Sequence, residues 1–160
     1  MNRRIILIGP AAAGKDFLKR KFEGRGFRLD VSYTTRPKRA EEIEGKDYYY
    51  YSEEDFQKKI DAGGFYEWVK HGDYRYGTGQ WEWDYMDIFI METDGIKHIK
   101  EEDRKSCFVI LLDPPEHERI KRMRLERRWD YEKIQKRLAT DKAKFQDFKD
   151  YDMIITDPYF

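Results

Sequence analysis

The residues from Arg4 to Phe17 decide the fold: they read Arg-Ile-Ile-Leu-Ile-Gly-Pro-Ala-Ala-Ala-Gly-Lys-Asp-Phe. The first five form a short apolar run that a glycine ends, which is typical of a buried strand in a parallel sheet. Gly9, Gly14 and Lys15 have the spacing G-x-x-x-x-G-K of a phosphate-binding loop, and a helix is expected directly afterwards. Glycines let backbone N–H groups surround an anion, and the helix N-terminus adds the positive end of its dipole. The stretch therefore predicts a nucleotide-binding loop.

The residue after this lysine departs from the usual pattern, in which a serine or threonine hydroxyl binds magnesium. Here it is Asp16, whose carboxylate oxygens are also ligands that Mg²⁺ accepts. We expect Asp16 to contact Mg²⁺ directly or through water, and helix capping alone is the alternative. Lys15 is expected to reach the outer phosphates. The residues expected to hold ATP are Gly9, Pro10, Ala11, Ala12, Ala13, Gly14, Lys15, Asp16 and Phe17.

Composition limits the class of protein. The 160 residues fit one domain, and an aromatic content of 16% argues against disorder. Lys+Arg and Asp+Glu are both 32, so no overall positive charge favours nucleic acid as a partner. No run approaches the ~20 apolar residues of a membrane span, so no membrane partner is expected. The single cysteine, Cys107, lies in an apolar run and reads as a core thiol in a cytoplasmic protein.

Beyond the loop, short apolar strands alternate with helical segments, which predicts an α/β fold with a parallel sheet flanked by helices. Further strands of this sheet are expected at 27–31, 88–91, 107–112 and 153–155, and helices at 16–22, between 91 and 107, from 116 to about 128, and at 131–148. A small mixed insert is expected to contain a helix at 52–62 and strands at 65–69 and 74–76. Its core is expected to include Tyr49, Tyr50, Tyr51, Tyr66, Tyr74 and Tyr85. The three histidines show no metal-ligand spacing and are assigned to the surface: His71, His98 and His117.

Several motifs in the insert keep a common order and spacing. They are Ser32-Tyr-Thr-Thr-Arg36-Pro-Lys-Arg39, Glu44-Gly-Lys-Asp-Tyr48, Phe65-Tyr-Glu67-Trp68 and Tyr76-Gly-Thr78. Together with the phosphate loop, this series resembles the guanylate kinase family, and the resemblance extends from about residue 5 to residue 157. It implies a P-loop NTPase-type fold with a monophosphate-binding insert and a helical lid.

The resemblance also implies roles for residues of the insert. They are Arg36, Arg39, Tyr48 and Tyr76 at the phosphate of the acceptor nucleotide, and Ser32, Glu67 and Thr78 at its guanine base. Guanidinium groups bind phosphate oxygens in a bidentate manner. A carboxylate only accepts hydrogen bonds, and guanine presents two donors, N1–H and the 2-amino group. Adenine presents an acceptor at N1, so Glu67 should reject it.

The segment from about 122 to 137 resembles the lid of this family, whose arginines neutralise charge on the transferring phosphoryl group. Residue types select Arg124, Arg128 and Arg137, whereas spacing back from Arg137 selects Arg122 instead. A solvated basic helix is the alternative reading. With the lid, the full set of residues expected to be catalytic is Lys15, Arg36, Arg124, Arg128 and Arg137.

Two further features differ from the family pattern. The family strand corresponding to 87–95 usually carries two aspartates before its glycine, and here those positions hold Ile90 and Glu92. Glu92 is assigned to the GMP-binding site. The helix that usually follows the last strand is missing, and its place on the apolar surface is expected to be taken by one or more of Trp81, Trp83, Tyr159 and Phe160.

The resemblance implies Mg²⁺-dependent, in-line transfer of a phosphoryl group from ATP to GMP or dGMP. We expect one kinase domain over 1–160, with a core at 1–31 and 80–160, an insert at about 32–79 and a lid at about 122–137. One alternative is a ribose 1,5-bisphosphate phosphokinase of the same fold, whose loop can also carry Asp after Lys. The other is a guanylate-kinase-like binding module without activity. The base-reading residues argue against the first and the intact loop against the second, and the oligomeric state stays open.

Overall fold

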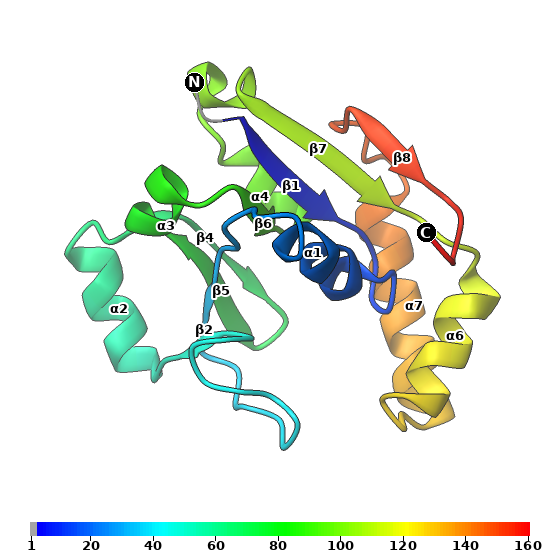
Figure 1. The fold of residues 1–160 in the computed structure, drawn as a ribbon. Helices are drawn as coiled ribbons and strands as arrows, with labels where there is room; N and C mark the ends of the chain where they lie inside the picture. The colour runs from blue at the N-terminus through cyan, green and yellow to red at the C-terminus, as the bar shows by residue number, and fades with distance from the viewer. Residues whose placement is uncertain (1–2) are drawn as a thin grey trace.

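A computed structural model describes residues 3–160 (Figure 1). The central sheet is parallel throughout, and its strands follow the order β6-β1-β7-β8. These strands are β1 (Arg4–Ile8), β6 (Ile88–Ile90), β7 (Cys107–Leu112) and β8 (Met153–Ile155). In register, Ile6 lies between Phe89 of β6 and Val109 of β7. The predicted α/β fold with a parallel sheet flanked by helices is confirmed.

Side chains alternate between the two faces of this sheet, and a different set of helices covers each face. Leu7 faces α1 (Lys15–Glu23), where it joins a buried cluster that Leu18 of that helix packs against. Ile6 and Ile8 face the other side, toward α4 (Thr93–Lys97) and the end of α7 (Tyr131–Phe145). Because both faces are covered over most of β1, β6 and β7, these strands are largely continuous apolar runs, whereas β8 at the edge of the sheet is mostly exposed.

A second sheet forms the insert and lies beside the first (Figure 1). Its strand order is β3-β2-β5-β4, in which β5 is antiparallel to both of its neighbours. The strands are β2 (Tyr33–Thr34), β3 (Tyr49–Tyr50), β4 (Phe65–His71) and β5 (Tyr74–Gly79). Helix α2 (Glu53–Asp61) begins at the predicted cap, where the Ser52 hydroxyl accepts from the Asp55 amide at 3.0 Å. Helix α3 (Gln80–Tyr85) then leads the chain back to β6.

Four predicted elements differ in the structure. The strand at 27–31 is reduced to one bridge between Leu29 and Ile88, because the carbonyl of Arg28 accepts from two successive amides and the strand cannot extend. The helix between β6 and β7 is two short helices, α4 and α5 (Glu101–Arg104). Helix α6 (Glu116–Leu125) ends before Arg128, which has a φ of 52°, and α7 ends at Phe145 rather than at 148.

Aromatic packing joins the insert to the core. Tyr66 stacks on Trp83 at 3.8 Å between ring centroids, and Trp83 is only 2% exposed. Of the six tyrosines expected in the core of the insert, four are half-buried: Tyr49, Tyr50, Tyr51 and Tyr66. The prediction was wrong for Tyr74 and Tyr85, since both are exposed at the ends of their elements.

Of the remaining residues that were expected to cover apolar surface, some are exposed and one is packed against the core. Trp81 and Tyr159 are exposed, whereas Phe160 packs against the cluster on the α1 face. Cys107 is buried as predicted, and burial raises the pKa of its thiol to about 11. Over residues 3–160, no helix is long and apolar enough to cross a membrane.

Candidate active site

The phosphate loop occupies residues 9–14 between β1 and α1. Gly14 has a φ of 98°, which a glycine adopts without strain, and α1 begins directly after it. A Cβ at Gly9 would lie 2.5 Å from the carbonyl oxygen of Leu112, so only glycine fits there. Lys15 Nζ donates to the carbonyl oxygens of Gly9 at 2.6 Å and Pro10 at 3.1 Å. The ammonium group therefore lies across the loop, in contact with the residues predicted to hold phosphate.

Burial lowers the pKa of Lys15, and the nearby carboxylates Glu92 and Asp16 oppose that change. The loop thus has one partly buried cation with two acidic neighbours. Phe17 is exposed and packs edge-on against Phe160, at 6.1 Å between ring centroids.

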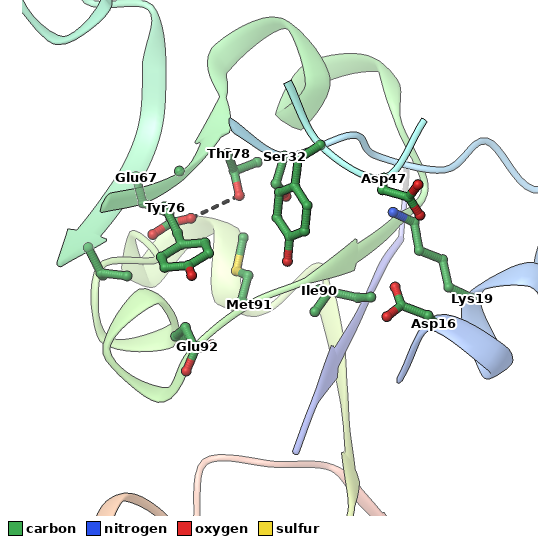
Figure 2. Close-up of a pocket in the computed structure, with 13 residues that line it drawn as sticks. Asp16, Lys19, Ser32, Asp47, Glu67, Tyr76, Thr78, Ile90, Met91 and Glu92 are labelled. Atoms are coloured by element: carbon green, nitrogen blue, oxygen red, sulfur yellow. Dashed lines mark hydrogen bonds between the residues drawn. The ribbon is translucent and has the colours of Figure 1, made fainter. Parts of the chain in front are cut away.

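One pocket brings together most of the residues predicted for the acceptor nucleotide (Figure 2). Its lining comes from the start of α1, from the insert and from the segment that follows β6. The predicted residues in the lining are Asp16, Ser32, Tyr48, Glu67, Tyr76, Thr78 and Glu92. Ile90, which stands in place of a carboxylate, also lines it. The pocket therefore joins the helix after the phosphate loop to the base-reading residues.

Glu67 lies in the pocket wall that is predicted to read the base, and it is only 8% exposed. Its Oε1 accepts from the Thr78 hydroxyl at 2.8 Å, and its buried Oε2 has no hydrogen-bond partner among the described residues. Burial raises the pKa of Glu67 to about 7; the Thr78 bond opposes this, and the charge of Asp30 adds to it. An unpartnered buried oxygen is costly, so this wall favours a ligand that donates to it.

Asp30 is a site residue that sequence reasoning missed. It is 0% exposed, and its Oδ2 accepts from the Ser32 hydroxyl at 2.6 Å, while its Oδ1 has no hydrogen-bond partner in residues 3–160. Burial raises the pKa of Asp30 to about 6, against the opposing effects of Lys19 and Ser32. Its position two residues before Ser32 in an extended segment was the available signal, because such residues share a face.

The two hydroxyls of this wall therefore act alike. Ser32 and Thr78 each donate their hydrogen to a buried carboxylate, which leaves their oxygen lone pairs to face the pocket. The wall is rich in acceptors as a result. It matches a purine edge with several N–H donors, such as that of guanine, and disfavours the N1 acceptor of adenine.

Arg36, which is predicted to bind the phosphate of the acceptor nucleotide, is held by a neighbouring carboxylate. The Arg36 guanidinium donates to Glu42 through Nη1 at 3.0 Å and Nη2 at 2.6 Å, and it lies 5.5 Å from the ring centre of Tyr48. Burial opposes ionisation of Glu42, but the Arg36 bond and the Arg39 amide hold its pKa at about 2. The side chain of Arg39 is exposed. Burial raises the pKa of Tyr48, so its hydroxyl keeps its proton and can donate to a phosphate.

His71 packs against two cations of α7, so its assignment to the surface was wrong. It is half-buried at the end of β4, where its Nε2 lies 3.0 Å from Arg137 Nη1 and its Nδ1 contacts Lys144 Nζ. Burial lowers the pKa of His71. Lys144 also donates to Glu92 at 3.4 Å, and this positive charge, with that of Lys15, lowers the pKa of Glu92 against the effect of burial. His98 and His117 are exposed, as predicted.

The lid arginines take different positions. Arg137 is half-buried and contacts His71, whereas Arg124 and Arg128 are exposed; the catalytic roles of all three stay predictions. Arg122 donates to the carbonyl oxygen of Ala12 in the phosphate loop at 3.0 Å. Arg127, just after α6, is exposed, and its guanidinium lies 5.2 Å from the ring centre of Trp129.

The position of Asp16 is compatible with a role as a magnesium ligand. Within the described chain, no group of three or more His, Cys, Asp or Glu side chains could hold a metal ion by itself. Asp16 lies in the first turn of α1, one residue after Lys15, and lines the acceptor pocket. Mg²⁺ in phosphoryl-transfer sites commonly uses one or two carboxylates together with substrate phosphates and water. The residues present fit that arrangement.

Comparisons with known proteins agree with this geometry. The family model described as "Guanylate kinase" matches residues 1–160. The chain is 34% identical to the guanylate kinase of Mycoplasmopsis pulmonis, covering 95% of this chain and 85% of that protein. It is 30% identical to the guanylate kinase of Sus scrofa, covering 96% and 83%. The crystal structure of guanylate kinase from Anaplasma phagocytophilum superposes with a TM-score of 0.72 at 23% identity, over 96% of this chain and 76% of that one.

Proposed function

Because this chain belongs to the guanylate kinase family, we propose that it transfers the γ-phosphoryl group of ATP to GMP or dGMP. One observation carries the choice of acceptor. The pocket next to the phosphate loop has an acceptor-rich wall, in which Glu67 keeps one buried oxygen without a partner. Guanine supplies N–H donors to that wall, and adenine does not at its N1.

The chemical step transfers one phosphoryl group without a covalent intermediate on the protein. A phosphate oxygen of the acceptor attacks the γ-phosphorus of ATP, a new O–P bond forms, and the bond to the β-phosphate oxygen breaks to leave ADP. Lys15 and the amides of the loop hold the donor phosphates. Arg36, Arg39 and Tyr48 place the acceptor phosphate in line, and catalysis is positioning together with charge stabilisation.

Magnesium, with Asp16 as its protein ligand, would offset charge on the outer phosphates when bound. Arg137 contacts His71 at the end of β4 and Asp141, which binds the phosphate loop, and we assign it to neutralising charge on the transferring group. Arg124 and Arg128 join it when the lid closes and excludes water, which would otherwise hydrolyse ATP.

We also propose one domain, with a core, an insert and a lid, in the cytoplasm. The insert returns to the core through α3, and Trp83 of that helix is part of the core cluster, so the two sheets share buried surface. Cys107 is a buried free thiol, which suits a reducing compartment.

The two alternative functions are less consistent with the site. A ribose 1,5-bisphosphate acceptor has no base, and it would leave the Glu67 and Asp30 oxygens buried without donors. A binding module has no need for Lys15, which here lies against the loop at hydrogen-bond distance.

A coupled assay of ADP release tests the proposal with four acceptors: GMP, dGMP, AMP and ribose 1,5-bisphosphate, each with and without Mg²⁺. We expect turnover with GMP or dGMP that requires Mg²⁺, and little with AMP. Turnover with ribose 1,5-bisphosphate alone would assign the chain to the sugar phosphokinases. No turnover with any guanine nucleotide would overturn the proposal.

A further inference from the structure

Asp141 is a buried carboxylate on α7 that joins the lid helix to the phosphate loop. It is 2% exposed. Its Oδ2 accepts from the backbone N–H of Ala11 at 2.9 Å, across 130 residues of chain. Its Oδ1 accepts from Arg137 Nε at 3.1 Å, one helical turn earlier on α7. One side chain therefore contacts both the loop and an arginine predicted to be catalytic.

The loop is held from two sides at this point. Arg119 of α6 is buried, and its Nη1 donates to the carbonyl oxygen of Ala11 at 3.4 Å and lies 3.6 Å from Asp141 Oδ2. The backbone N–H of Ala11 is therefore bound by a side chain of α7, and its carbonyl oxygen by a side chain of α6. Ala11 and Ala12 also pack in a cluster with Ile134 and Leu138 of α7. The middle of the loop is fixed to α7 by both polar and apolar contacts.

Arg137 is oriented by the same carboxylate. A guanidinium group carries five N–H donors in a rigid plane. In Arg137, Nε is bound by Asp141 and Nη1 by His71, so the plane is fixed at two points and the Nη2 group remains for a phosphate oxygen. A guanidinium group that is already held at two of its nitrogens loses little conformational freedom when it binds an anion.

The charge of Asp141 is required as well as its shape. Arg119 and Arg137 are the two cations within 4 Å of it, and the Arg119 side chain is only 9% exposed. Removing the partner of a buried charge leaves that charge uncompensated, which is strongly unfavourable. An asparagine could still accept from the Ala11 amide but could not balance either arginine.

We propose that Asp141 is a positioning residue for phosphoryl transfer, which sets Arg137 at a fixed place relative to the phosphate loop. The inference rests on the proposed function, because it assigns Arg137 to the transferring phosphoryl group. Asp141 acts on that group only through Arg137, which it holds against the phosphate loop. It contacts none of the base-reading residues, so GMP binding should not depend on it.

Steady-state kinetics of Asp141→Asn, corrected for the folded fraction by circular dichroism, test the proposal. We expect kcat to fall roughly tenfold or more, since small displacements of a charge-stabilising group cost that much. The KM for GMP should change less than about twofold, because the acceptor pocket is untouched. Asp147→Asn removes the same charge at an exposed position six residues later and should behave as wild type.

A double-variant cycle with Arg137→Ala separates positioning from general structural support. If Asp141 acts through Arg137, the double variant should be no slower than Arg137→Ala alone. Multiplicative losses would overturn the proposal, as would an unchanged kcat in Asp141→Asn. If Asp141→Asn does not fold, Asp141→Glu keeps the charge but displaces the loop, and the same loss of kcat with an unchanged GMP KM is expected; wild-type kcat there would overturn it.

The two proposals fail in distinguishable ways. Absence of GMP turnover in the unaltered chain would overturn the proposed function itself. Normal GMP turnover in that chain, with Arg137→Ala also fully active, would remove Arg137 from the chemistry and Asp141 with it. A slow Arg137→Ala with a fully active Asp141→Asn would overturn only the positioning role.

Discussion

The phosphate loop and the acceptor pocket lie on either side of the start of α1 and are built in different ways. The loop uses consecutive residues, 9–15, whose geometry follows from their own glycines and from the strand before them. The pocket uses side chains from α1, from the insert and from the end of β6. The loop is a local structure, and the pocket exists only after the two sheets have packed together.

The polar groups of the loop find their partners locally, whereas some of those at the pocket have none. The ammonium group of Lys15 donates to two carbonyl oxygens of its own loop. The pocket instead is lined by Glu67, and Asp30 lies behind its lining residue Ser32; each of these carboxylates has a buried oxygen without a partner in the described part of the chain. Such oxygens raise the free energy of the folded protein. A ligand with matching donors therefore stabilises the pocket through Glu67.

The largest effect should come from the loop. Lys15→Ala should lower kcat by roughly 10³-fold, since it removes the cation nearest the transferring phosphoryl group. Calorimetry should still show GMP binding within about twofold of wild type, because the base-reading wall is unchanged. Lys97→Ala, on the exposed surface of α4, is the control. If Lys15→Ala also abolished GMP binding, the loop and the pocket would not be separable.

The next effect should come from the pocket alone. Glu67→Gln keeps the shape of the side chain but offers guanine a donor where it needs an acceptor. The ratio of kcat/KM for GMP to that for AMP should fall at least roughly 100-fold. Gln57→Glu, on exposed α2, adds a carboxylate away from the pocket and should leave the ratio unchanged. Unchanged selectivity in Glu67→Gln would remove Glu67 from base recognition.

Protonation of the pocket should affect GMP binding by a smaller amount. The pKa of Glu67 is about 7 in the folded chain, and guanine requires its ionised form. The affinity for GMP should therefore rise roughly tenfold between pH 6 and pH 8, as the carboxylate loses its proton. Calorimetry at the two pH values measures this. The same dependence in Glu67→Gln would assign the titration to another group.

The smallest effect concerns Asp16, which belongs to both regions. Asp16→Ala should raise the Mg²⁺ concentration for half-maximal activity by roughly five- to tenfold, whereas Asp16→Ser should largely preserve activity, because a hydroxyl is also a magnesium ligand. A titration of Mg²⁺ at saturating ATP measures both. Wild-type behaviour of both variants would leave Asp16 only a role in the first turn of α1.

Elements with long apolar runs were predictable, and those held by distant contacts were not. The strands at 4–8 and 107–112 were found because each is a continuous apolar run that is largely buried. The strand at 153–155 was found from its three apolar residues, although two of them are exposed. The strand at 27–31 was wrong because its carbonyls and amides are used by one short bridge to β6. His71 was misplaced since its partners, Arg137 and Lys144, are 66 and 73 residues away on α7.

The sequence by itself determined the phosphate loop, the family and most of the base-reading residues. These depend on spacing within short segments, where backbone geometry is set locally. Only the tertiary structure decided that Asp30 fixes the Ser32 hydroxyl, that His71 contacts Arg137 and that Asp141 holds Ala11. Hydrogen bonds and ion pairs between distant segments depend on how sheets and helices pack, and no local pattern of residues records that packing.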